Sequence, residues 1–165
     1  MRREIVPEIL AGRKRACLAI TEAYAGSDVA SLRCTAVKSA DGSHYIVNGS
    51  KKYVPRAEGC AASNQAGSTP TNRARTLRRW ITNAVFADYF VAAVRTGGPG
   101  AGGISMLLIP AGEGVEVKLI KTDYSSAAGT GFVTFENVKV PVSNLMSKEN
   151  KGFAQVMANF NHERW

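Results

Sequence analysis

The sequence is poor in the residues that build metal sites and disulfide frameworks. It has three cysteines, at positions 17, 34 and 60, with no CxxC pair, and only two histidines. An odd, widely spaced set of cysteines argues against a disulfide framework, and so few histidines argue against a zinc site. We therefore expect no metal centre and a reducing, intracellular compartment; the sequence does not distinguish mitochondrion, peroxisome and cytoplasm.

Long apolar runs and phosphate-binding motifs are also missing. No stretch approaches the ~20 apolar residues that a membrane-spanning helix needs. The first residues carry charge without the apolar centre of a secretory signal. The pattern G-K-[S/T] is absent, and the G-x-G-x-x-G match at Gly98–Gly103 precedes a strand pattern instead of a helix. We therefore expect no membrane span and no nucleotide-binding loop of these types.

The composition is that of a soluble globular domain. The chain has 165 residues, 45% of them hydrophobic, and a net charge of +8. The positive charge gathers in the first fifteen residues and in Tyr53–Arg79, without interleaved aromatic residues. We therefore expect no nucleic-acid partner. A binding-only small β-barrel that contacts nucleic acid through the basic segment remains the alternative function.

Hydrophobic patterning predicts a mainly β protein. Short apolar or alternating runs predict strands at 16–20, 35–38, 44–47, 89–96, 104–109, 115–120, 132–135 and 138–140. Asp41-Gly42 and Asn48-Gly49 predict turns, and helices are predicted at 5–12 and 153–165. We expect a small antiparallel β-barrel or orthogonal two-sheet domain with helical segments at both termini. An irregular insertion, 53–79, has neither helical nor strand periodicity.

Two segments have the groups that a planar heterocycle needs. Ile20–Asp28 offers hydroxyls and backbone N–H groups in a loop with small residues, and Trp80 with Thr82 would place an aromatic ring and a hydroxyl on one face of a strand. A planar ligand binds to such a combination of stacking surface and edge donors. An ordinary turn and a core tryptophan would give the same residues, so both interpretations stay open at this point.

These segments resemble the signatures of the acyl-CoA dehydrogenase family. Cys17–Asp28 (CLAITEAYAGSD) resembles the first signature, and Asn48–Lys52 continued at Trp80–Asn83 resembles the second, cut in two. Val133–Pro141 and Asn150–Phe153 resemble later landmarks in the same order. The resemblance implies a middle β domain, 15–148, between the end of an N-terminal helical domain, 1–14, and the start of a C-terminal helical domain, 149–165.

The resemblance also implies a cofactor, a reaction and site residues. Members bind FAD and oxidise an acyl-CoA substrate at its α,β bond, pass the electrons to an acceptor, and are commonly homo-oligomers, tetramers or dimers. The implied cofactor-binding residues are Leu18, Ile20, Thr21, Gly26, Ser27, Trp80, Ile81 and Thr82. The implied substrate-binding residues are Ser27, Thr96, Asn161 and Arg164.

Two departures from the family pattern limit what we expect of this chain alone. The family's catalytic base is a carboxylate of the C-terminal domain, so we assign no catalytic residue here and expect a fragment with little or no turnover. Tyr53–Arg79 interrupts the second signature. It is either a surface loop of this lineage or a translated intron, and its composition and lack of periodicity favour the intron.

Overall fold

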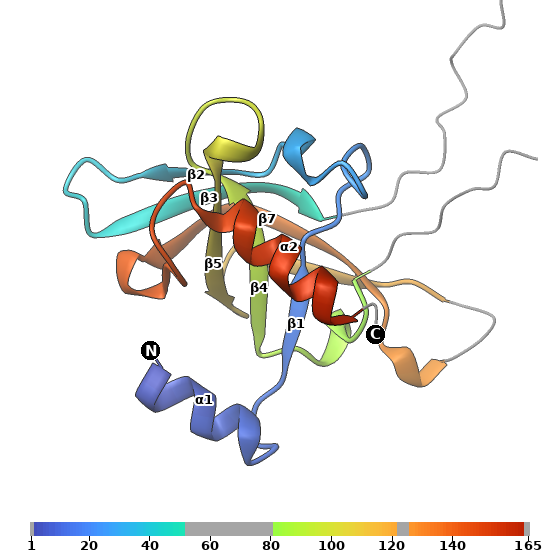
Figure 1. Ribbon diagram of the computed structural model, residues 1–165. Helices are drawn as coiled ribbons and strands as arrows, with labels where there is room; N and C mark the ends of the chain where they lie inside the picture. Colours follow the sequence, from blue (N-terminus) through green and yellow to red (C-terminus); the bar gives the residue numbers. More distant parts are fainter. Residues whose placement is uncertain (1, 52–80, 122–125, 164–165) are drawn as a thin grey trace, which may run out of the picture.

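The computed structural model describes residues 2–51, 81–121 and 126–163 (Figure 1). Two helices are described, α1 (Arg2–Leu10) and α2 (Gly152–Glu163). Seven strands lie between them: β1 (Ala16–Ala19), β2 (Thr35–Lys38), β3 (His44–Lys51), β4 (Tyr89–Arg95), β5 (Ile104–Pro110), β6 (Val115–Leu119) and β7 (Gly131–Pro141). Short 3₁₀ turns occupy Val29–Ser31, Ala84–Phe86, Ala101–Gly103, Ser126–Ala128 and Val142–Asn144. The mainly β fold class with helical termini is thus confirmed.

The seven strands form one curled sheet. Its order is β1-β4-β2-β3-β7-β6, with β5 also pairing with β4. The pairs β2–β3, β3–β7, β4–β5 and β6–β7 are antiparallel, whereas β4 pairs in parallel with β1 and, at one position, with β2. The molecule is therefore a half-barrel built from a single sheet, with β1 and β6 at the two ends of this strand order.

The predicted turns have different outcomes. Asp41-Gly42 lies in the connection between β2 and β3, and Gly42 has a left-handed φ of 70°. Asn48-Gly49, in contrast, lies within β3, where the pairing with β7 shifts register between Val47 and Gly49. The turn predicted there is wrong. The chain continues as a strand with a β-bulge, in which Asn48 of β3 faces two residues of β7, Glu136 and Asn137. Asn48 bonds both the side chain and the backbone N–H of Asn137 across the bulge.

Both faces of β4 and β5 are buried. Successive side chains of a strand point to opposite faces, so alternate residues of each strand join different core clusters. Phe90, Ala92 and Val94 join one core cluster with residues of β3 and β7. Val91 and Ala93 join a second cluster with Val156 of α2. In Figure 1, α2 crosses the sheet over β4 and β1, whereas α1 lies apart from it. The second cluster thus packs α2 against the sheet beside β1.

Candidate functional site

A hollow of about 390 Å³ lies where β1 ends, between the sheet and α2. Its lining comes from three parts of the chain and comprises Ala16, Cys17, Leu18, Ile20, Thr21, Thr82, Asn83 and Phe160. Four residues predicted to bind the cofactor, Leu18, Ile20, Thr21 and Thr82, are therefore brought together from the two separate signatures. Phe160 of α2 adds an aromatic side chain to this lining.

The backbone of β1 offers hydrogen-bonding groups toward this side. β1 ends the strand order, so only one of its edges is paired, with β4. The Arg15 carbonyl accepts the Tyr89 N–H of β4 at 3.1 Å. Successive backbone groups of a strand point to alternate edges. Cys17 and Ala19 therefore bond with β4, and the N–H and C=O of Ala16 and Leu18 face the open edge.

Two hydroxyl groups complete the polar part of the hollow. Within the described residues, the side chains of Thr21 and Thr82 make no hydrogen bond, so both hydroxyls are open to a ligand. Thr82 is held in place by its neighbours: Ile81 forms an isolated bridge with Gly131, and the Asn83 N–H bonds the Ala128 carbonyl at 2.8 Å. The Ile81 side chain itself is buried in the core rather than in the hollow.

The hollow meets the requirements of a planar ring with a polar edge. The Leu18 backbone and the Thr21 and Thr82 hydroxyls supply edge donors, and Ile20 and Phe160 supply apolar contact. Cys17 adds no competing charge, because burial raises the pKa of its thiol to about 12. These residues fit a flavin ring.

An ion pair that the sequence analysis did not single out lies directly behind this hollow. Lys51 Nζ is 2.8 Å from Glu22 Oε1, and the two side chains are 0% and 5% exposed. Lys51 also donates to the Ala93 carbonyl at 2.5 Å and to the Ile20 carbonyl at 3.4 Å. In the sequence, Glu22 directly follows a residue predicted to bind the cofactor and Lys51 belongs to the second signature, but nothing there indicated that the two meet.

Other predicted site residues lie outside the hollow lining. Gly26 and Ser27 lie in the loop between β1 and the turn at Val29–Ser31, with Ser27 exposed. Asn161 is exposed near the end of α2. Trp80 and Arg164 lie outside the described residues, and so does the basic segment on which the nucleic-acid alternative depends.

Thr96 is engaged in a network of its own. Its hydroxyl lies 2.6 Å from Ser105 Oγ and 2.8 Å from Asn150 Oδ1, and the Asn150 N–H donates to Ser105 Oγ at 2.7 Å. This network ties the end of β4 to the residues that precede α2. In this arrangement Thr96 helps to place α2, and its predicted contact with substrate stays a prediction.

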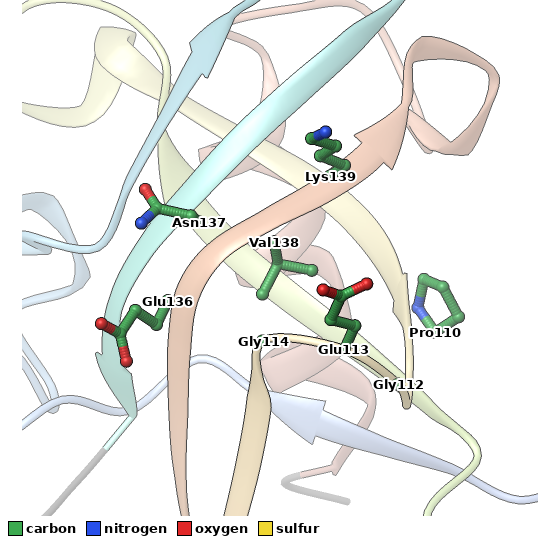
Figure 2. A pocket seen from close by; sticks show the side chains of 8 residues that line it. All are labelled: Pro110, Gly112, Glu113, Gly114, Glu136, Asn137, Val138 and Lys139. Atoms are coloured by element: carbon green, nitrogen blue, oxygen red, sulfur yellow. The ribbon is translucent and has the colours of Figure 1, made fainter.

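A larger hollow of about 610 Å³ lies elsewhere, between the β5–β6 turn and β7 (Figure 2). Glu113 and Glu136 lie on opposite sides of β7, and Lys139 projects away from both (Figure 2). The polar groups of this larger hollow do not converge on one point, as those of a binding site do.

The described residues contain no group of three or more potential metal ligands. Neither described helix is long and apolar enough to cross a membrane.

The structure is a curled β domain with a hollow lined by parts of both signatures where β1 ends. A family model described as "Acyl-CoA dehydrogenase, middle domain" matches residues 17–72. An acyl-CoA dehydrogenase of Emericella nidulans is 43% identical over 99% of this chain and 32% of its own length. The crystal structure of acyl-CoA dehydrogenase from Geobacillus kaustophilus matches with a TM-score of 0.76 at 29% identity, over 99% of this chain and 37% of that one.

A further solved structure matches in fold. An acyl-CoA dehydrogenase from Bacillus anthracis, complexed with FAD, matches with a TM-score of 0.70 at 24% identity, over 94% of this chain and 22% of that one. At this identity it supports the fold alone. Taken together, the matches show that the chain belongs to the acyl-CoA dehydrogenase family and includes its middle β domain. It spans about a third of the length of the curated relatives it matches.

Proposed function

We propose that this chain supplies the middle-domain wall of the FAD site in an acyl-CoA dehydrogenase. The observation that carries the proposal is the meeting of Leu18, Ile20 and Thr21 with Thr82 around one hollow. The two groups of residues are far apart in the sequence, and each belongs to a different signature of the family. Shared lining of one hollow is what a common ligand requires.

The residues would act by binding and orientation. FAD, when bound, supplies a hydride acceptor for the β-carbon of an acyl thioester. The N–H of Leu18 and the hydroxyls of Thr21 and Thr82 donate to the polar edge of the ring, where negative charge builds up during reduction. Ile20 and Phe160 exclude water from the ring.

The remaining predicted residues would serve the extended parts of the cofactor and substrate. Gly26 and Ser27 would lie along the cofactor chain and the acyl-CoA, and a role for Trp80, which lies outside the described residues, is proposed from the family resemblance alone. The whole protein would oxidise an acyl-CoA to its 2-enoyl form and pass the electrons to an acceptor, as a homo-oligomer with this domain at 15–148. Glu22 is not proposed as the base, because its carboxylate is already paired with Lys51 behind the wall.

A titration of the 165-residue chain with FAD tests this proposal. We expect the flavin fluorescence to change on binding and Thr82→Ala to weaken binding about fivefold, the effect of one lost hydrogen bond of ~1 kcal/mol. Thr35→Ala is the matched control, because Thr35 is exposed and lines none of the hollow. Adding an acyl-CoA should not bleach the flavin. Absence of FAD binding, or equal loss in both variants, would refute the proposal.

A further inference from the structure

The buried pair of Lys51 and Glu22 joins four segments around the first signature. Lys51 contacts Ile20, Glu22 and Ala93 through its one ammonium group. Glu22 in turn accepts the backbone N–H groups of Arg33 at 2.7 Å and Cys34 at 3.0 Å. The end of β3 is thereby fastened to the residues after β1, to β4 and to the segment that leads into β2.

The pair acts on the wall of the hollow without being part of it. Neither Lys51 nor Glu22 lines the hollow, but the Ile20 carbonyl and the Glu22 carboxylate flank Thr21, which does. A second bond, from the Glu22 N–H to the Ala25 carbonyl at 3.0 Å, closes the turn that follows. Thr21 therefore lies between a backbone carbonyl that accepts from Lys51 and a residue that is held by Lys51 through its side chain and by Ala25 through its backbone N–H.

A buried ion pair is not an efficient source of stability. Removing two charges from water costs several kcal/mol, and well-packed apolar residues of similar volume often stabilise a fold equally well. What the pair does provide is a single geometry, because each charge must remain against its partner. This property is needed where a ligand is bound by backbone groups, which cannot adjust as side chains do.

We propose that Glu22 and Lys51 are positioning residues that fix Ile20 and Thr21 in the conformation that binds the flavin ring. This inference depends on the proposed function. The pair makes no contact with the hollow and acts through the backbone on either side of Thr21. Its loss should therefore impair cofactor binding even in a protein whose sheet remains folded.

The double variant Glu22→Gln/Lys51→Met tests the inference. It removes both charges, so no unpaired charge is left buried. The glutamine side-chain oxygen can still accept a hydrogen bond from the backbone N–H of Arg33 or Cys34. We expect the NMR amide signals of Leu18–Ala25 to shift in the apo chain, while those at the far end of the β3–β7 ladder, His44–Val47 and Val138–Pro141, stay in place. We also expect FAD to bind about tenfold more weakly, as expected for a misplaced binding segment. Val140→Ala is the control, since Val140 is fully buried in the core cluster of β3, β4 and β7, whereas Ile20 belongs to the cluster beneath α2.

The outcomes separate this inference from the proposed function. If the double variant keeps wild-type amide signals and FAD affinity, or if Val140→Ala weakens FAD binding equally, the inference is wrong. If the unaltered chain fails to bind FAD, the proposed function is wrong and the inference fails with it, even where the amides shift. If the double variant does not fold, the same two measurements on Glu22→Asp, which keeps both charges and shortens the carboxylate side chain, decide by the same criteria.

Discussion

Two loops of this molecule are each held by one basic side chain, and they differ in how that charge is compensated. Lys51 holds the loop after β1 and is fully buried. Arg95 holds the glycine-rich turn between β4 and β5 and is only partly buried. It donates to the carbonyls of Leu32, Gly98, Gly100 and Ala30.

The difference follows from solvation. A fully buried ammonium needs an opposite charge, and Glu22 supplies it. A guanidinium that keeps part of its hydration can be satisfied by carbonyl oxygens, and within the described residues Arg95 has no carboxylate partner. The loop beside the hollow is therefore fixed by an ion pair inside the protein, and the glycine-rich turn by hydrogen bonds close to solvent.

The largest expected effect comes from Lys51→Met. This change leaves the Glu22 carboxylate buried without its partner, and such a loss costs about 3–5 kcal/mol of unfolding free energy. Urea unfolding followed by circular dichroism measures the loss. A cost below ~1 kcal/mol would show that the carboxylate finds water or another partner, and the distinction between the two loops would fail.

Arg95→Met should cost less, about 1–3 kcal/mol, because the carbonyls it leaves are partly exposed and can bond to water. We expect the amides of Gly97–Gly103 to exchange faster with deuterium, while FAD affinity stays unchanged. Hydrogen exchange and the same urea titration are the measurements. A loss as large as that of Lys51→Met would contradict the role of exposure.

The smallest expected effect is a loss of stability at alkaline pH that depends on Cys17, a residue of the hollow lining. Burial raises the pKa of Cys17 from 9.0 to about 12 and also raises the pKa of Cys34. Between these values the unfolded chain loses thiol protons that the folded chain keeps, so stability falls as pH rises above about 9. Urea midpoints at pH 8 and pH 10 should differ less in Cys17→Ala than in the unaltered chain. An identical difference would show that Cys17 does not titrate with unfolding.

Much of the fold could be predicted because strand patterns are local. Strands were predicted at 89–96 and 104–109, and β4 (Tyr89–Arg95) and β5 (Ile104–Pro110) form there, on either side of the glycine-rich turn. The runs at 132–135 and 138–140 join into one long strand, β7, since Asn137 adopts a left-handed φ of 50° at the bulge and the strand continues. Local patterns cannot show that a turn-forming residue will be absorbed in a ladder.

Four of the eight residues predicted to bind the cofactor line the hollow, whereas the contacts that hold them in place were not predicted. Leu18, Ile20, Thr21 and Thr82 were identified through the family resemblance, and they line one hollow. The participation of Phe160 and the pairing of Glu22 with Lys51 were not predicted. Both depend on contacts between segments that are distant in the chain, for which the sequence has no local pattern.

The sequence by itself determined which segments become strands, because alternation of apolar side chains is a property of neighbouring residues. It also determined the family, because the signatures are short local runs, although Tyr53–Arg79 divides one of them. Only the tertiary structure decided that the open edge of β1 faces the same hollow as Thr82, and that Lys51 reaches Glu22 there. Such meetings result from how the sheet curls and where α2 packs, and the whole folded chain sets both.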